Sequence, residues 1–236
     1  MQISSSTPTA GSAPSDAADT ARAPAAFADR GRRPVVAVLD YGIGNLRSAQ
    51  KALEFVGVDA PLTADKALIA DADAVVLPGV GSFGSCVEAL DRAGLTETAI
   101  QAAGSGRPFL GICVGMQMLF EASEESPGVS GLGVLDGVVQ RLPDGQRRPQ
   151  MQWNRLEVTA EDPAPHVAAL EGSWMYFVHS YAAELGPSTV AVCDYGGPTT
   201  SVVRSGALLA TQFHPEKSGA DGLGMLARFA ESLESR

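Results

Sequence analysis

The stretch Phe109–Phe120, FLGICVGMQMLF, decides the fold of this 236-residue chain. It begins as a continuous apolar run typical of a buried parallel strand, and from Val114 onward its spacing is typical of a helix. Cys113 lies at the junction, between Gly111 and Gly115. A cysteine between small residues at a sharp strand-to-helix turn is the pattern of a nucleophile elbow, which lifts one side chain above the carboxyl edge of a sheet.

The predicted elbow helps the Cys113 sulfur in two ways. The partial positive charge at the start of the predicted helix favours a thiolate, and the backbone amide of Val114 points toward the place where an oxyanion forms. Because an ordinary thiol has a pKa of about 8.5, an active thiol also needs a base. The alternative interpretation is that Cys113 is a small buried apolar residue.

The sequence repeats a strand, loop and helix pattern around this stretch. Apolar runs followed by helical spacing occupy residues 34–57, 72–106 and 107–123. Continuous apolar strands that alternate with helices indicate a parallel sheet covered on both faces. Shorter strand patterns at residues 132–142, 154–160, 174–182 and 189–195 predict an antiparallel or mixed extension. The chain then returns with a strand at 206–216 and a last helix at 222–234.

Composition limits the class of protein. Residues 1–33 are rich in small and polar residues and predict a disordered tail, whereas residues 34–236 predict one α/β domain. The formal net charge of -10 argues against a nucleic-acid partner. No apolar run approaches the roughly 18 to 20 residues of a membrane span, and three cysteines without a CxxC pair argue against disulfides and thiolate zinc sites. We expect a cytoplasmic protein.

Three histidines are candidate bases for the thiol: His166, His179 and His214. His214 is distinctive because the sequence His-Pro-Glu ends a predicted strand. In an extended chain residues i and i+2 point the same way, so Glu216 is placed to orient the imidazole of His214. Cys113, His214 and Glu216 then supply the nucleophile, base and orienting acid of a triad. The alternative for the His-Pro-Glu segment is an ordinary surface turn.

A glycine-rich segment, LPGVGSFG at residues 77–84, follows another predicted strand. Its glycines allow backbone amides to approach a ligand and to reorient, which suits a second oxyanion donor. A tight strand-to-helix turn is the simpler interpretation of that segment alone. The segment YGIGNLR does not complete a dinucleotide-binding GxGxxG pattern, because Arg47 stands where the last glycine is required. No metal-ligand pattern is present, so we expect neither a metal nor a cofactor.

The segment GICVGMQ together with a distant HPE resembles the class I (triad) glutamine amidotransferases. Further segments resemble one branch of that family, the glutaminase subunits of imidazole glycerol phosphate synthase: DYGIGNLRSAQKALE, VVLPGVGSFG, LFEASEE, MQWN, YFVHSYAAE and TQFHPEKSG. The resemblance covers residues 34–236. It implies a class I glutamine amidotransferase-like three-layer α/β/α fold, with a mostly parallel central sheet and a smaller antiparallel extension.

The resemblance also implies roles for individual residues. Cys113 attacks the glutamine side-chain amide, His214 transfers the proton and Glu216 holds the imidazole. The oxyanion is met by amides at Val114 and, after a peptide reorientation, in the loop that contains Val80 and Gly81. The residues implied in glutamine binding are Gly79, Gln117, Glu125, Ser180 and Tyr181.

The resemblance further implies a heterodimer in which a separate (β/α)8-barrel cyclase subunit uses the released ammonia. Interface positions of the family match Asn45, Trp153, Tyr176 and Lys217, for which packing or plain surface exposure is the alternative. One departure is visible: the family often has His-Met-Gly-Trp-Asn where this chain has QMQWN at residues 150–154. The departure puts the local loop and its interface contacts in doubt.

Three other functions stay open at this point. The chain could serve another synthase, such as the pyridoxal 5'-phosphate one, although DYGIGNLRS and YFVHSYAAE argue against that. A non-catalytic paralogue would usually lack a member of the triad. A stand-alone thiol hydrolase would act without any partner.

Overall fold

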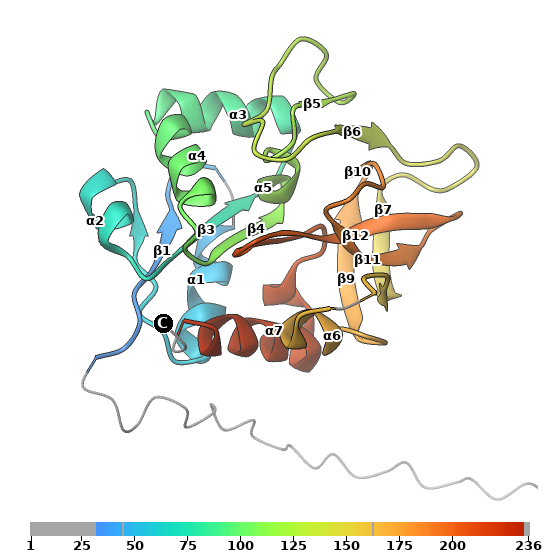
Figure 1. Ribbon diagram of the computed structural model, residues 1–236. Helices are drawn as coiled ribbons and strands as arrows, with labels where there is room; N and C mark the ends of the chain where they lie inside the picture. Colours follow the sequence, from blue (N-terminus) through green and yellow to red (C-terminus); the bar gives the residue numbers. More distant parts are fainter. Residues whose placement is uncertain (1–31, 44, 162, 234–236) are drawn as a thin grey trace, which may run out of the picture.

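The computed structural model describes residues 32–43, 45–161 and 163–233. Its centre is an eight-stranded sheet in the order β2-β1-β3-β4-β13-β12-β11-β8 (Figure 1). The first five strands of this order run parallel to one another, and the last three continue the sheet in antiparallel pairs. Their bounds are β1 Val36–Leu39, β2 Leu62–Thr63, β3 Ala74–Gly79, β4 Phe109–Cys113, β8 Glu157–Val158, β11 Thr189–Asp194, β12 Pro198–Ser205 and β13 Leu208–Thr211.

Helices cover both faces of this sheet, as the continuous apolar strands predict. Every residue of β1, β3, β4 and β13 is buried, because no face of these strands meets water. Helices α1 (Leu46–Phe55) and α7 (Gly219–Glu231) pack together on one face, and α2 (Lys66–Asp71), α3 (Phe83–Arg92) and α4 (Thr96–Gly104) lie on the other (Figure 1). The predicted α/β fold with a mostly parallel central sheet is confirmed.

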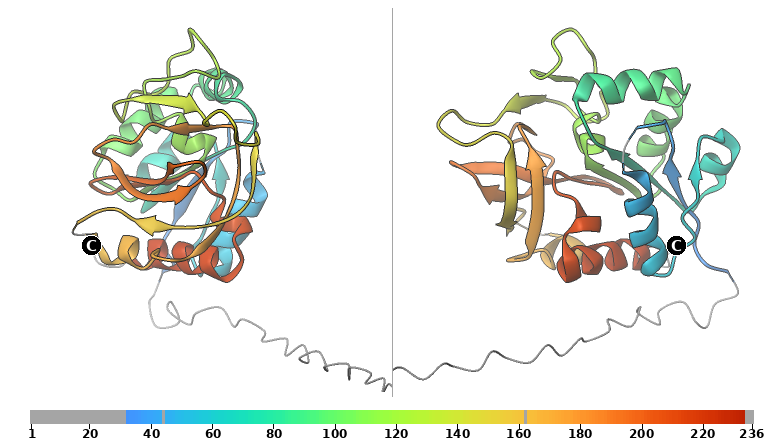
Figure 2. Two further views of the ribbon diagram at one scale, coloured as in Figure 1. Left: turned by 90° about the vertical axis from the view of Figure 1, so that its right-hand side faces the viewer. Right: turned by 180° about the vertical axis from the view of Figure 1, so that it is seen from behind.

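Two small sheets form the predicted extension, seen on the opposite side from α2 in Figure 2. Strands β10, β6 and β5 form one sheet, and β7 pairs antiparallel with β9 in the other. A four-residue helix, α6, precedes β9. The bounds are β5 Ala122–Ser123, β6 Val138–Arg141, β7 Gln150–Arg155, α6 Pro165–Ala168, β9 Trp174–His179 and β10 Tyr181–Ala183.

The structure corrects two expectations about the extension. The predicted strand at 174–182 breaks at Ser180, so its two halves, β9 and β10, join different sheets. The segment at 150–154, treated above as a loop, is most of strand β7. Its six residues pair with β9 from Gln150 opposite His179 to Arg155 opposite Trp174.

The helix predicted after Cys113 is also much shorter than expected. Helix α5 has only four residues, Val114–Gln117. The following carbonyl groups are taken by another segment: Leu132 N donates to Met118 O at 2.7 Å, and Leu135 N donates to Leu119 O at 2.9 Å. Because these carbonyls bond outside the helix, the helix cannot continue, and one turn carries little of the dipole that was expected to assist the thiol.

The predicted tail lies outside the described residues as far as residue 31. Arg32 is described, and its guanidinium pairs with the Asp73 carboxylate at 2.9 Å. Over the described ranges, no helix is long and apolar enough to cross a membrane. Among the same residues, no cluster of three or more potential metal ligands is present.

Candidate active site

Cys113 ends strand β4 with a backbone that few residues adopt. Its φ is 55° and its ψ is -113°, and it is the only non-glycine residue with positive φ in the part of the chain that the structure describes. Such a conformation costs of order 1 to 3 kcal/mol and persists only where the surroundings impose it. The strain is the signature of a nucleophile elbow, which the sequence pattern predicts at this residue.

Three glycines allow the backbone to pack tightly enough to hold the elbow. A Cβ atom on Gly115 would lie 1.9 Å from the carbonyl oxygen of Leu77, and one on Gly79 would lie 2.6 Å from the backbone nitrogen of Gly115. At Gly111 the added carbon would lie 2.9 Å from the Cβ of Ala210. Each of these positions therefore requires glycine because of close approach.

The register of the sheet brings His214 to Cys113. Strand β13 pairs in parallel with β4, with Thr211 opposite Ile112, so both strands end at the same edge. His214 follows three residues after Thr211, and its backbone N–H donates to Tyr176 O at 3.1 Å. The hydroxyl of Ser218 donates to the carbonyl of His214 at 2.6 Å. These bonds fix the backbone that carries the imidazole.

His214 contacts a buried acid. Its Nδ1 lies 2.8 Å from Glu216 Oε1, and the two side chains are 2% and 4% exposed. Burial alone lowers the pKa of His214, but the hydrogen bonds that its ring makes with Cys113 and Glu216, and its electrostatic interactions with both, outweigh burial and raise the pKa to about 9. At neutral pH the imidazole is therefore protonated, so the cationic help for the thiol comes from His214 rather than from helix α5.

The local geometry of the His-Pro-Glu segment differs from the expected extended chain. Residues Pro215–Lys217 form a 3-10 helix, η1, with Pro215 at its first position, where a missing N–H does not matter. His214 is extended, with φ -102° and ψ 95°, and Glu216 returns to it through the tight turn. The expected contact is present, although the argument from an extended chain is wrong.

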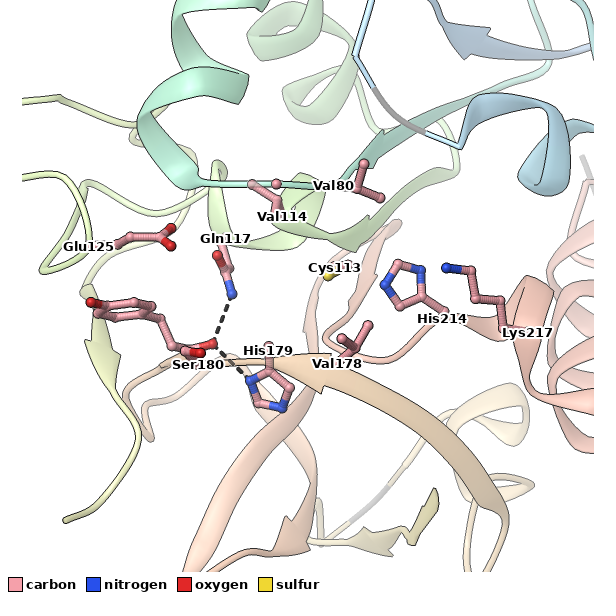
Figure 3. Close-up of a pocket in the computed structure, with 12 residues that line it drawn as sticks. Val80, Cys113, Val114, Gln117, Glu125, Val178, His179, Ser180, His214 and Lys217 are labelled. Carbon is pink, nitrogen blue, oxygen red and sulfur yellow. Dashed lines mark hydrogen bonds between the residues drawn. The ribbon is translucent and has the colours of Figure 1, made fainter. Parts of the chain in front are cut away.

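A cavity of about 290 Å³ opens beside the sulfur. Cys113 and His214 both point toward it in Figure 3, with Lys217 beyond the imidazole. This volume is at the lower end of the range for small-molecule sites, so the cavity suits a compact metabolite. Its lining residues are Val80, Gly81, Cys113, Val114, Gln117, Glu125, Val178, His179, Ser180, Tyr181, His214 and Lys217.

The glycine-rich loop after β3 forms one wall of the cavity. Gly79 pairs with Cys113 across the sheet, which places Val80 and Gly81 next to the elbow. Tyr41 Oη donates to Pro78 O at 2.6 Å, and the Cys86 thiol donates to Val80 O at 3.2 Å. Burial raises the pKa of Cys86 to about 11, so this thiol keeps its proton and acts as a donor.

Four predicted substrate residues form the wall farther from the sheet edge. Gln117 Nε2 donates to Tyr181 O at 2.9 Å, which leaves its Oε1 as an acceptor. Glu125 Oε2 accepts from the N–H of Phe83 at the start of α3, at 2.7 Å. Ser180 lies at the corner between β9 and β10, beside Tyr181. Gly79 does not line the cavity, because it is covered by the elbow.

Three of the predicted partner residues, Asn45, Trp153 and Tyr176, do not line the cavity, whereas Lys217 does. Trp153 and Tyr176 are opposite one another on β7 and β9, and their rings form an edge-to-face pair with centroids 6.1 Å apart. Trp153 is 48% exposed. Lys217 is exposed at the rim of the cavity, and Asn45 is exposed before the first turn of α1.

Comparison with known proteins agrees with this geometry. A family model described as glutamine amidotransferase class-I matches residues 38–232. A relative from Methanothermobacter thermautotrophicus, imidazole glycerol phosphate synthase subunit HisH, is 46% identical over 204 residues, which cover 85% of this chain and 100% of the relative. A HisH subunit from Symbiobacterium thermophilum is 47% identical over 201 residues, which cover 84% of this chain and 94% of the relative.

The chain belongs to the class-I glutamine amidotransferase family, in its HisH branch. The family and branch expected from the sequence are thereby confirmed.

Solved structures show the same fold at lower identity. A glutamine amidotransferase crystal structure superposes with a TM-score of 0.67 at 24% identity, over 85% of this chain and 99% of that chain. The structure of PurLQS from Thermotoga maritima gives a TM-score of 0.66 at 22% identity, over 85% and 98% of the two chains. These likenesses support the amidotransferase fold and carry no information about the substrate.

Sequence reasoning missed one polar residue of this amidotransferase site, Gln212, and considered His179 only as a candidate base. His179 Nδ1 lies 2.9 Å from Tyr181 O and lines the cavity. Gln212 Nε2 donates to Cys113 Sγ at 3.8 Å. Gln212 precedes His214 by two residues, and its place beside the sulfur depends on the pairing of β13 with β4, which the local sequence pattern does not reveal.

Proposed function

We propose that this chain hydrolyses L-glutamine to glutamate and ammonia and passes the ammonia to a (β/α)8-barrel cyclase subunit. That partner converts phosphoribulosyl-formimino-AICAR-phosphate into imidazole glycerol phosphate and AICAR, in histidine biosynthesis. The observation that carries the proposal is the strained Cys113 elbow beside a buried, protonated His214 that Glu216 holds. The three unpaired cysteines suit a cytoplasmic complex.

The chemistry follows from these groups. The Cys113 sulfur attacks the side-chain carbonyl carbon of glutamine, and the carbonyl oxygen becomes an oxyanion. His214 gives a proton to the nitrogen, the carbon–nitrogen bond breaks, and ammonia leaves a thioester on the sulfur. His214 then takes a proton from water, whose oxygen attacks the thioester, and the sulfur leaves as glutamate is released.

The oxyanion needs donors that face it before the bond forms. The amide of Val114 is at the elbow, and we assign the second amide to the loop that contains Val80 and Gly81. The Cys86 thiol holds the Val80 carbonyl, so the peptide reorientation occurs within a restrained loop. Losing one such donor typically costs about 2.7 to 4 kcal/mol of transition-state stabilisation.

The far wall of the cavity is suited to the amino-acid end of glutamine. Glu125 has one carboxylate oxygen bonded to Phe83 N, and its other oxygen is assigned to the substrate α-ammonium. Gln117 Oε1, Ser180 and Tyr181 supply further polar groups around the cavity. Gly79 serves this wall indirectly, by allowing the loop to pack against the elbow.

An exposed apolar face beside the cavity supports a protein partner. On the β7 and β9 ribbon, alternate residues point outward, and Met151, Trp153 and Trp174 are 63%, 48% and 53% exposed. Val178, on the same face, also lines the cavity, so the face is continuous with the site. Gln150 and Gln152, the two residues that depart from the family pattern, lie on the other face of this ribbon from Met151 and Trp153, so we expect the proposed interface to tolerate the departure.

Cys113→Ala tests the proposed reaction. In complex with the cyclase, the variant should lose glutamine-dependent turnover while turnover on supplied ammonium salts continues, because the cyclase needs only ammonia. Glutamine-dependent turnover by the variant would contradict the role of Cys113. Wild-type chain should hydrolyse glutamine slowly alone and much faster with cyclase and its ligand; full activity alone would indicate a stand-alone hydrolase.

Trp153→Ser tests the proposed partner face. A buried tryptophan at an interface centre typically contributes 2 kcal/mol or more, so cyclase affinity should fall by about 30-fold. Leu185→Ser is the matched control, because Leu185 is 53% exposed and does not belong to the β7 and β9 ribbon. Equal affinities for the two variants, measured by titration calorimetry, would place the interface elsewhere.

A further inference from the structure

Gln212 contacts the sulfur on which the chemistry depends, although the proposed mechanism assigns it no role. It follows strand β13, is fully buried, and its backbone N–H donates to Ser201 O at 2.9 Å. Its side-chain nitrogen lies 3.8 Å from Cys113 Sγ, within reach of a hydrogen bond to sulfur. A buried amide needs hydrogen-bond partners for both its nitrogen and its oxygen. The role of Gln212 therefore depends on which of these two atoms faces the sulfur.

The orientation of the Gln212 amide follows from a backbone carbonyl. The Tyr181 oxygen can only accept, so the Gln117 atom 2.9 Å from it must be the amide nitrogen. The same nitrogen lies 3.1 Å from the Gln212 side chain, which must therefore present its oxygen. The nitrogen of Gln212 is then left facing the sulfur of Cys113.

His179 makes a hydrogen bond to the same Tyr181 carbonyl oxygen that accepts from Gln117. Its Nδ1 lies 2.9 Å from the Tyr181 carbonyl and must carry the proton, for the same reason. Burial is the main cause that lowers the pKa of His179 to about 4, so its ring stays neutral at neutral pH. The chain of contacts therefore runs from His179 through Tyr181 O and Gln117 to Gln212, and it ends with an N–H aimed at the sulfur.

An N–H that points at sulfur favours the thiolate over the thiol, because the charged sulfur is the stronger acceptor. His214 also stabilises the thiolate but must give up its proton to the leaving ammonia. The amide of Gln212 keeps its protons throughout the cycle. It is therefore available both when the thiolate attacks and when the sulfur leaves the thioester.

We propose that Gln212 is a thiolate-binding residue of this amidotransferase, and that Gln117 and His179 are positioning residues that orient its amide. The inference rests on the proposed function for its catalytic meaning. The contact itself is a property of the free chain, so it is testable without glutamine or cyclase.

The experiment measures alkylation of Cys113 by iodoacetamide against pH in the free full-length chain, with the Cys113 peptide followed by mass spectrometry. Gln212→Leu removes the donor and should move the midpoint of the profile to higher pH by about one to two units. Gln101→Leu is the matched control, because Gln101 is exposed on α4 and its amide donates to Glu97 at 2.9 Å, so its profile should equal that of wild type.

Gln117→Leu gives an independent variant, should Gln212→Leu not fold. It keeps Gln212 and removes the group that orients it, so the midpoint should move in the same direction by a smaller amount. Superposable profiles for wild type and a folded Gln212 or Gln117 variant would overturn the inference. A shifted profile in a chain that no cyclase stimulates would instead overturn the proposed function and leave this contact in place.

Discussion

Two histidines line the same cavity and their pKa values move in opposite directions. His214, after β13, has a pKa raised to about 9, whereas His179, at the end of β9, has a pKa lowered to about 4. Both are buried, at 2% and 6% exposure, and burial disfavours the charged form of both. Burial therefore cannot explain the difference between the two.

The groups that face each ring explain the difference. His214 faces Glu216 at 2.8 Å and the sulfur of Cys113, and its interactions with both favour the protonated imidazole. His179 faces a neutral carbonyl, Tyr181 O, through Nδ1, and among the described residues its buried Nε2 has no hydrogen-bond partner. The same side chain is thus an acid–base group at His214 and a neutral hydrogen-bonding group at His179.

The largest expected effect separates these two roles. His214→Asn removes the proton carrier, so glutamine-dependent kcat in the cyclase complex should fall by about 10² to 10⁴-fold. His179→Asn is its counterpart, because asparagine offers an N–H near the place of Nδ1, and its kcat should fall by less than about 10-fold. A similar loss in both variants would show that His179 takes part in proton transfer.

Glu216→Gln should make the imidazole of His214 more like that of His179, which is neutral at neutral pH. The variant keeps a hydrogen-bonding group but loses the charge, so the pKa of His214 should fall, as measured by NMR titration. A hydrogen bond to a charged group contributes about 1.5 to 3 kcal/mol, which corresponds to roughly a 10- to 150-fold loss in kcat/KM. Glu88→Gln is the control, because Glu88 is an exposed helix residue 3.7 Å from Arg92 and should change neither quantity.

The two histidines should also limit stability at opposite ends of the pH range. The raised pKa of His214 stabilises the fold fully below about pH 6.5, and this contribution is lost as pH rises through 9. The lowered pKa of His179 means that the unfolded chain binds the extra proton, so the free energy of unfolding falls as pH drops from 6.5 through 4. Each contributes a slope of up to about 1.4 kcal/mol per pH unit.

Urea unfolding at several pH values measures these slopes. His214→Asn should flatten the alkaline side of the stability curve and leave the acid side as in wild type, and His179→Asn should do the reverse. Unchanged curves in both variants would mean that the two side chains titrate alike in the folded and unfolded chain.

The sequence predicts the catalytic residues Cys113, His214 and Glu216 more clearly than it predicts the surroundings of His179. The elbow at Cys113 is predictable because flanking glycines and a strand-to-helix change are local signals. The pairing of His214 with Glu216 is predicted from their spacing of two residues, although a 3-10 turn makes the contact and not the extended chain that was expected. The parallel strands are predictable because burial on both faces makes them continuously apolar.

The surroundings of His179, at the end of β9, depend on hydrogen-bond partners that the local sequence pattern does not reveal. The strand break at Ser180, which turns Tyr181 O toward both His179 and Gln117, arises from pairing with two different sheets. The early end of α5 arises from residues 132–135, whose N–H groups bond to the carbonyls of Met118 and Leu119 just after the helix. Such features are set by tertiary hydrogen bonds between segments far apart in the chain, so periodicity and turn residues do not encode them.

The smallest expected effect on activity comes from giving His179 the acidic partner that it lacks. Gln150 is directly opposite His179 in the β7 and β9 pair, is fully buried, and its Oε1 has no partner within the described residues. Opposite side chains on an antiparallel pair are about 4.5 to 5.5 Å apart at Cβ, so Gln150→Glu places a carboxylate beside the ring.

In Gln150→Glu the pKa of His179 should rise by one unit or more, because the carboxylate favours the protonated ring, and the fall in stability toward pH 4 should weaken. Gln152→Glu is the matched control: it lies on the same strand but is exposed, so the pKa of His179 should stay low. Activity near pH 7 should change less than about threefold, because His214 and Glu216 are untouched. An unchanged His179 pKa in Gln150→Glu would show that the facing acid, which distinguishes His214, is not sufficient to protonate a buried imidazole in this site.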